Sequence, residues 1–110
     1  MRFKEGDVVL VPYTWKDEEG LIQFKIRPAV VYRIESDTEQ LMIKCTHVNR
    51  SAQFPGKWIL KNSKQGQEMG IKEDTFIHYT DTLTIKENYV KRLIGRCSFM
   101  DEIIAFHEED

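Results

Sequence analysis

Short runs of apolar and β-branched residues, separated by turn-forming residues, recur along most of this chain. Runs of roughly four to eight such residues are typical of strands and are too short for buried helices. Turn formers such as Gly6-Asp7, Ser36-Asp37 and Pro55-Gly56 separate them. The pattern predicts strands at 8–13, 29–34, 40–46, 57–60, 74–80, 83–85 and 92–96.

The last part of the chain has a helical period instead. Phe99, Ile103 and Phe106 recur at three- and four-residue spacing, which predicts an amphipathic helix over 99–107. Ser98 is placed to be its N-cap, with Asp101 three residues on as a short-armed capping box. We also expect one helical turn at 86–90, a long polar hairpin loop with some strand at its far end over 14–26, an irregular segment at 47–56 and a turn at 62–66.

Many short strands and one terminal helix predict a mostly β fold with a C-terminal helix, arranged as a small β-barrel or a strongly curved sheet. The length of 110 residues is that of one domain, spanning 1–110. Hydrophobic residues at 41% and charged residues at 31% exclude a disordered chain. No apolar run reaches the ~18 residues of a membrane span, and the charged start is unlike a signal peptide. We therefore expect a cytoplasmic protein without a membrane partner.

The two cysteines, Cys45 and Cys97, are too few for a disulfide framework and lack CxxC spacing. In a reducing compartment they are expected to be free thiols, and Cys97 to be a small packed residue. A structural zinc site is not indicated, because such sites use four Cys or His ligands. No metal or cofactor is predicted from the sequence.

The net charge of −2 at pH 7 conceals an uneven distribution. Five acids lie in the last ten residues, and no acid occurs between Glu39 and Glu68. That acid-free stretch carries basic and aromatic residues, namely Lys44, His47, Arg50, Phe54, Lys57, Trp58, Lys61 and Lys64. Basic side chains neutralise phosphate and aromatic rings stack bases, so this stretch is either a nucleic-acid surface or a solvated loop.

Several of these segments form an ordered set that resembles a known family. The set begins with Gly6-Asp7-Val8-Val9-Leu10-Val11, a polar loop and Lys25-Ile26-Arg27-Pro28-Ala29-Val30-Val31. It continues with Cys45-Thr46-His47, Glu68-Met69-Gly70-Ile71, Asp74-Thr75-Phe76-Ile77, Leu83-Thr84-Ile85 and Lys91-Arg92-Leu93-Ile94-Gly95-Arg96-Cys97-Ser98. Over about residues 3–106 the chain resembles the MazF/PemK toxins of bacterial toxin–antitoxin pairs.

The resemblance implies a CcdB-like, SH3-like barrel that forms a homodimer. It implies a metal-independent endoribonuclease that cuts single-stranded RNA, often mRNA, at short sequences. The products would carry a 2′,3′-cyclic phosphate and a 5′-hydroxyl. The implied partner is a small antitoxin protein whose disordered segment covers the RNA groove.

Two residues match the catalytic positions of the family. Arg27 matches the arginine before Pro-Ala-Val, and a guanidinium can bind phosphate through two parallel hydrogen bonds. With a pKa above ~12, Arg27 suits electrostatic stabilisation better than proton transfer; the alternative is a surface ion pair. Thr46 matches the threonine at the end of the third strand, where its hydroxyl would bind the scissile phosphate.

Neighbouring positions depart from the family pattern. Lys44 and His47 stand where the family has proline and serine. Some members have a catalytic arginine and aspartate near positions 78 and 80, which here are His78 and Thr80, and Asp81 lies one place off. Either His47 or His78 suits proton transfer, since the usual histidine pKa is ~6.5. The alternatives are a solvated His47 and a packed or exposed His78.

The remaining candidates are RNA-binding residues. They are Trp15, Lys16, Lys25, Lys44, Arg50, Lys57 and Thr80. In the family, the loop holding Trp15 and Lys16 often closes over RNA, and Trp15 would stack a base. The acids 17–19 in the same loop would repel phosphate, so the loop would alternatively meet the antitoxin. Phe54 and Trp58 are weaker candidates, and Trp58 suits a core position equally well.

A second function class uses the same barrel. CcdB-type barrels bind a protein target such as gyrase, or a regulator, without cutting RNA. Thr80 in place of an acid, the negative net charge and the acidic loop favour this interpretation. Arg27 and Thr46 at the expected positions favour the nuclease.

Overall fold

The structure is a computed structural model that describes residues 3–108. Glu109 and Asp110, two of the five acids near the end of the chain, lie outside these residues. The elements are the strands β1 (Asp7–Lys16), β2 (Ile22–Ile34), β3 (Glu39–Thr46), β4 (Gly56–Ile59), β5 (Thr75–Lys86) and β6 (Arg92–Arg96), the helices α1 (Lys64–Met69) and α2 (Met100–His107), and a 3₁₀ helix, η1 (Glu87–Tyr89).

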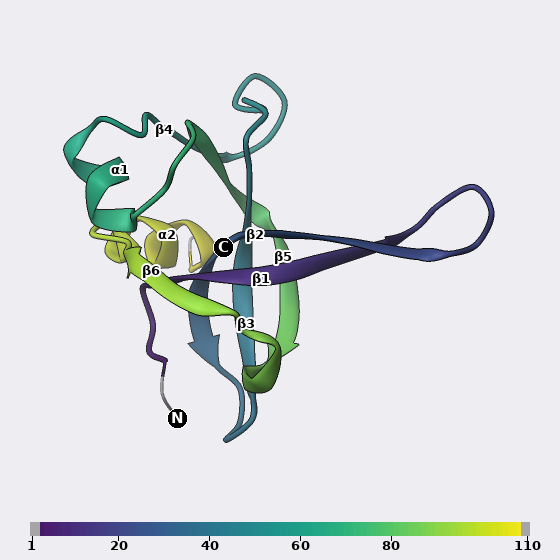
Figure 1. Cartoon of the computed structure of the whole chain (residues 1–110). Coiled ribbons are helices and arrows are strands. Elements are labelled where there is room, and N and C mark those ends of the chain that lie inside the picture. The colour runs from purple at the N-terminus through teal and green to yellow at the C-terminus, as the bar shows by residue number, and fades with distance from the viewer. Residues whose placement is uncertain (1–2, 109–110) are drawn as a thin grey trace.

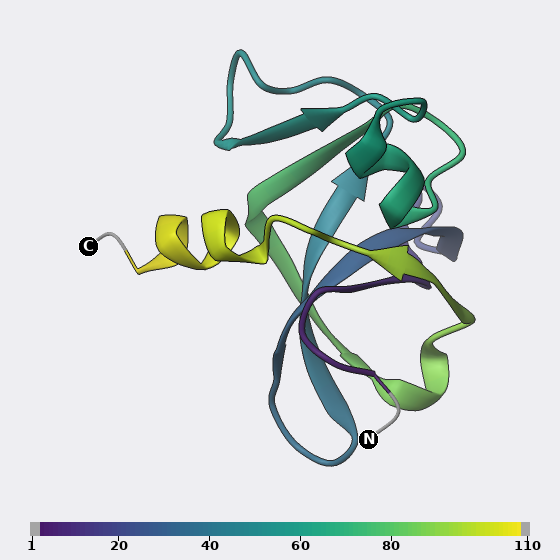
Figure 2. The ribbon, with the colours of Figure 1, turned by 90° about the vertical axis from the view of Figure 1, so that its left-hand side faces the viewer.

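All six strands join one antiparallel sheet in the order β4-β5-β3-β2-β1-β6. The sheet curls into a half-barrel, and α2 follows the last strand on one side of it (Figures 1 and 2). This confirms the prediction of a mostly β fold with a C-terminal helix. Within residues 3–108, no helix is both long and apolar enough to cross a membrane.

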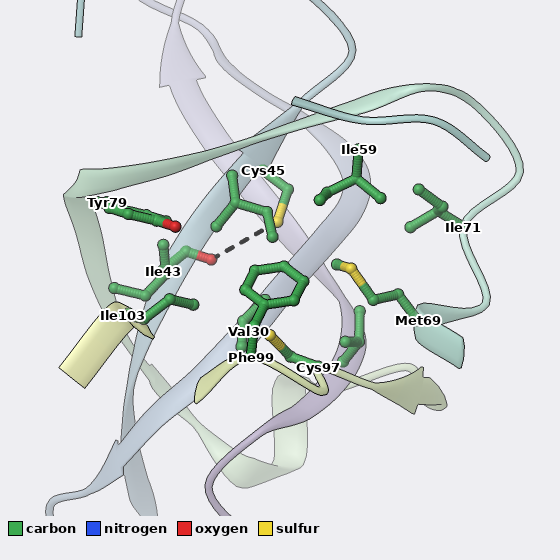
Figure 3. Packing of buried hydrophobic residues seen from close by; sticks show 12 residues of the cluster. Val30, Ile43, Cys45, Ile59, Met69, Ile71, Tyr79, Cys97, Phe99 and Ile103 are labelled. Carbon is green, nitrogen blue, oxygen red and sulfur yellow. Dashed lines mark hydrogen bonds between the residues drawn. The ribbon is translucent and has the colours of Figure 1, made fainter. Parts of the chain in front are cut away.

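Apolar side chains are buried on both faces of the curled sheet. One cluster packs the sheet against α2 and the segment after α1, and it includes Val30, Ile43, Met69, Phe99 and Ile103 (Figure 3). A second cluster, on the opposite face, includes Val9, Val11, Ala29, Val31 and Met42. Successive residues of a strand point to opposite faces, so burial on both faces explains why these strands are continuous apolar runs.

Cys45 and Cys97 are buried free thiols in the first cluster, as predicted. The side chain of Asp7 is also buried, and it joins β1 to β6. One carboxylate oxygen accepts a hydrogen bond from Arg96 and the other accepts the backbone N–H of Lys4. This ion pair holds the start of β1 against the strand that leads into α2.

The largest correction concerns residues 14–26, where we expected a long hairpin loop with strand only at its far end. Both strands continue through most of this range, and only residues 17–21 form the turn of a long β1–β2 hairpin. Beyond residues 11 and 28 the two strands pair with each other and project from the body as an arm (Figure 1). The Asp17 carboxylate accepts the backbone N–H groups of Glu19 and Leu21 and so organises the turn.

Two shorter predictions were also wrong at the element level. Residues 64–69 form a helix rather than part of a turn, with Ser63 as N-cap and Gly70 in the left-handed conformation after it. The strand predicted at 74–80 and resuming at 83–85 is found, and it runs without a break as β5. Ser98 is not the N-cap of α2: Phe99 takes that position, and the Asp101 carboxylate accepts the N–H of Glu102 instead. The helical turn predicted at 86–90 is η1.

Candidate functional site

Arg27 and Thr46 lie at the same end of the β2–β3 pairing, each still paired with its other neighbouring strand. The β2–β3 ladder ends at the pair Ala29–Lys44. Arg27 precedes Ala29 by two residues on β2, and Thr46 follows Lys44 by two residues on β3. Because the strands are antiparallel, both residues lie just beyond the last rung, and both side chains are partly exposed. The fold therefore brings together two residues that are far apart in the sequence.

A first cavity, of about 330 Å³, opens beside this pair. Arg27, Thr46 and His47 line it together with Lys72 and Arg92. Its lining also includes one acid, Glu73, and the apolar residues Leu10, Pro28, Cys45, Ile71 and Ile94. A surface of cations around apolar side chains suits a ligand that is both anionic and flat, such as a nucleotide.

His47 is bonded directly to Arg27. The distance between Arg27 Nη1 and His47 Nδ1 is 2.8 Å. A guanidinium only donates hydrogen bonds, so His47 Nδ1 accepts and the imidazole proton is on Nε2. In this arrangement His47 orients the guanidinium and can donate from Nε2, but it cannot accept a proton there.

A second cavity, of about 230 Å³, lies on the other side of the pair. Arg27 and Thr46 line it again, now with His78, Arg50 and Asp81. The two candidate histidines thus lie in different cavities that share one arginine and one threonine.

Aromatic neighbours hold His78 in place. Its ring centroid lies 4.8 Å from that of Phe54 and 5.7 Å from that of Phe76. Its Nδ1 atom lies 3.4 Å from the hydroxyl of Thr80. Phe54 and His78 together form a small aromatic surface at the second cavity, on which a base can stack.

Thr46 has a locally fixed hydroxyl. Its Oγ1 atom accepts the backbone N–H of Val48 at 3.3 Å, in the turn that follows β3. Because a hydroxyl also carries a donor, this arrangement leaves Thr46 able to donate a hydrogen bond to a phosphate oxygen.

The predicted RNA-binding residues fall into three groups. Arg50 and Lys44 line the second cavity, where Lys44 Nζ lies 3.6 Å from a carboxylate oxygen of Asp81. Thr80 contacts His78 at the rim. The rest lie elsewhere: Trp15, Lys16 and Lys25 on the arm, and Lys57 at α2.

Lys57, another predicted RNA contact, is paired with residues outside the two cavities. Its Nζ atom bonds the Glu102 carboxylate at 3.0 Å and lies 4.6 Å from the Phe99 ring centroid. Its charge is therefore engaged by α2. Trp58 on the same strand is partly buried and belongs to neither apolar cluster.

On the arm, each face has a different character. Residues directly opposite in a hairpin share a face. Trp15, Lys25 and Tyr13 lie on the face that continues into Arg27. The other face carries Ile22, Phe24 and Ile26, which are 70%, 61% and 40% exposed.

Three residues of the site were not found by sequence reasoning. Lys72 and Arg92 add positive charge to the first cavity, and Tyr13 bonds to both strands that carry Arg27 and Thr46. Lys72 and Arg92 carry no local signal, because they join the site only when the sheet curls. For Tyr13, the signal available was an aromatic residue with a polar tip at the end of an apolar run.

Residues 3–108 contain no group of three or more His, Cys, Asp or Glu side chains placed to hold a metal ion. No family model matches the chain, and a search of curated proteins found no match.

Proposed function

We propose that this protein is an endoribonuclease that cuts single-stranded RNA without a metal, and that it acts as the toxin of a type II toxin–antitoxin pair of the MazF/PemK kind. The observation that carries the proposal is that Arg27, Thr46 and His47 line one cavity, with Lys72 and Arg92 around it. A hydroxyl and several cations at one opening suit the phosphodiester backbone.

In the proposed reaction, the ribose 2′-oxygen attacks the adjacent phosphorus and the bond from phosphorus to the 5′-oxygen breaks. The products are a 2′,3′-cyclic phosphate and a 5′-hydroxyl. Arg27 and Thr46 donate hydrogen bonds to the non-bridging oxygens, whose charge grows in the transition state. His47, bonded to Arg27 at 2.8 Å, fixes the guanidinium in that orientation.

Two proton transfers accompany this step. A solvent water takes the proton that leaves the 2′-hydroxyl, and another proton is delivered to the departing 5′-oxygen. We assign the second to His78, which lines the second cavity beside Arg27 and Thr46. His47 is less suited to accept the first proton while Arg27 occupies its Nδ1.

The proposal includes partners and a place of action. As a toxin of this kind, the chain would act on mRNA in the cytoplasm as a homodimer. A small antitoxin would cover the cavities, and their basic lining favours an acidic segment of that partner. The exposed Trp15 on the arm would contact RNA or the antitoxin.

The test is cleavage of a long single-stranded RNA by purified protein in excess chelator. We expect fragments with 5′-hydroxyl ends, and at least a ~100-fold slower reaction for Arg27→Ala and for Thr46→Ala. The matched controls are Arg33→Ala, which removes an exposed arginine from the same strand, and Thr84→Ala, which removes an exposed threonine from β5.

Both controls should cut at the wild-type rate. Wild-type rates for Arg27→Ala and Thr46→Ala would show that the site is misassigned. Intact RNA at high protein concentration would contradict the nuclease itself.

A second candidate function is a barrel of the same kind that binds a protein target such as gyrase, or a regulator, without catalysis. The exposed apolar face of the arm, formed by Ile22, Phe24 and Ile26, favours it. Large exposed apolar patches mark protein-binding surfaces more often than nucleic-acid surfaces. Intact RNA together with growth arrest on expression would support this function over the nuclease.

A further inference from the structure

Tyr13 connects the three strands around the candidate site. It lies on β1, opposite Lys25 of β2. Its hydroxyl donates a hydrogen bond to the carbonyl oxygen of Pro28 and accepts the backbone N–H of Cys45 at 2.9 Å. One side chain is thus bonded to β2 one residue after Arg27, and to β3 one residue before Thr46.

The Tyr13 hydroxyl lies where the next backbone hydrogen bond between β2 and β3 would form. The last observed rung is Ala29–Lys44, and the next facing positions are Pro28 and Cys45. Proline has no N–H, so a direct rung there would offer at most one hydrogen bond. The Tyr13 oxygen is inserted between the two backbone groups instead, and it therefore separates the strand ends.

The phenol is suited to this role because it keeps its proton. Burial, together with the nearby Cys45, raises the pKa of the Tyr13 phenol well above its usual range. At physiological pH the hydroxyl therefore donates and accepts at the same time. The Lys44 ammonium lies 5.6 Å from the centroid of the Tyr13 ring, and the ring packs against the second apolar cluster.

We propose that Tyr13 is a positioning residue of the RNA-cutting site, whose hydroxyl sets the spacing of β2 and β3 and thereby the placement of the Arg27 guanidinium relative to the Thr46 hydroxyl. The inference rests on the proposed function, since that function makes the spacing matter for chemistry. Tyr13 acts through the two strands and not through contact with RNA.

This role has a kinetic signature. In the proposed site, RNA binding uses many contacts along both cavities. The transition state, in contrast, is stabilised only when Arg27 and Thr46 donate hydrogen bonds to the same phosphate. A displacement of about 1 Å can cost roughly 100-fold in rate. Loss of the hydroxyl should therefore lower kcat and leave KM nearly unchanged.

The experiment compares Tyr13→Phe and Tyr13→Leu with Tyr79→Phe. Tyr79 is a buried tyrosine whose hydroxyl donates to Glu102 at 3.3 Å. It lies on β5 next to His78 but packs in the first apolar cluster, so Tyr79→Phe removes a similar bond on the opposite face of the strand. If Tyr13→Phe does not fold, Tyr13→Leu carries the test, since its smaller side chain lets Pro28 accept directly from Cys45.

For the folded protein, we expect kcat to fall by about 10- to 100-fold in the Tyr13 variants, with KM within about threefold. The Tyr79→Phe variant should keep the wild-type kcat. A purely structural role for Tyr13 would lower the melting temperature of Tyr13→Phe and leave kcat of the folded protein unchanged, and this result would overturn the positioning role.

A readout independent of cleavage is the ¹⁵N chemical shift of His47 Nδ1, which accepts from Arg27. The hydrogen-bonded shift should be altered in Tyr13→Phe and retained in Tyr79→Phe. An unchanged Nδ1 shift together with unchanged kcat would overturn the positioning role and leave the nuclease standing. If the wild type cuts no RNA, the proposed function fails, and the Nδ1 shift alone decides whether Tyr13 positions Arg27.

Discussion

The two thiols show how burial fixes the chemistry of single residues. Cys97 is 4% exposed, and burial raises the pKa of its thiol to about 11. Burial raises the pKa of the Cys45 thiol further. Both groups therefore stay protonated at neutral pH and have the character of small apolar residues rather than nucleophiles.

These shifts predict a loss of stability in alkaline solution. An unfolded thiol ionises near pH 8.5 to 9, whereas folded Cys97 stays protonated until about pH 11. The folded state binds the proton more tightly, so its stabilisation is complete below about pH 8 and declines as pH rises to 11. We expect the free energy of unfolding in urea to be lower at pH 10.5 than at pH 8.

The control for this prediction is Cys97→Ala measured at the same two pH values. Removing the thiol removes its share of the decline, although the variant is less stable at both. An equal decline in the variant and the wild type would show that other groups cause it.

Among the elements, the short helix α1 depends on the residues at its ends. Ser63 accepts the N–H of Gly66 at the start, and Gly70 closes the helix with a φ of 72°. A Cβ at Gly70 would lie 2.0 Å from the carbonyl oxygen of Ile94 on β6. The left-handed turn thus sets α1 directly against the edge strand and shapes one wall of the first cavity.

We therefore expect Gly70→Ala to lower the free energy of unfolding by more than about 2 kcal/mol. The matched control is Gly20→Ala in the arm. Gly20 also has a positive φ, of 80°, but no atom lies within 4 Å of a Cβ built there. Gly20→Ala should therefore lower the free energy of unfolding only by the strain of the left-handed backbone, about 1 kcal/mol. Urea denaturation compares the two, and equal losses would contradict the role of the Ile94 contact.

The elements also show which signals the sequence contained. The apolar runs around Val8-Val9, Val30-Val31 and Met42-Ile43 predicted strands because both sheet faces are buried there. The arm was misinterpreted because its outer half is exposed on both faces and has no core to impose a simple pattern. Helix α1 is too short for an apolar period.

Local sequence patterns likewise predict only part of the candidate site. Arg27 and Thr46 were identified through family resemblance, and the fold places them together. Lys72 and Arg92 follow from how the strands and the connection after α1 curl around the cavity, which no local pattern records. The ion pair of Lys57 with Glu102 likewise joins residues 45 apart in the sequence, and no local pattern records it.

Across the whole molecule, basic and acidic side chains are unevenly distributed. The net charge is −2, yet Arg27, Arg50, Lys72 and Arg92 surround the two cavities. One acid lines each cavity, Glu73 in the first and Asp81 in the second, so that basic residues outnumber acidic ones around both. An anion approaching the cavities therefore meets a positive local field on a negative protein.

This field predicts how RNA binding depends on salt, and a noncleavable 2′-O-methyl oligonucleotide measures it without catalysis. Each phosphate neutralised on a single strand contributes about −0.7 to the slope of log affinity against log salt concentration. If Arg92 neutralises one phosphate at the first cavity, Arg92→Ala should reduce the magnitude of the slope by about 0.7. Arg33→Ala, which removes an exposed arginine bonded to Glu35, should leave it unchanged. Equal slopes for the wild type, Arg92→Ala and Arg33→Ala would show that RNA does not bind at Arg92, because the same number of counterions would be released with and without this residue.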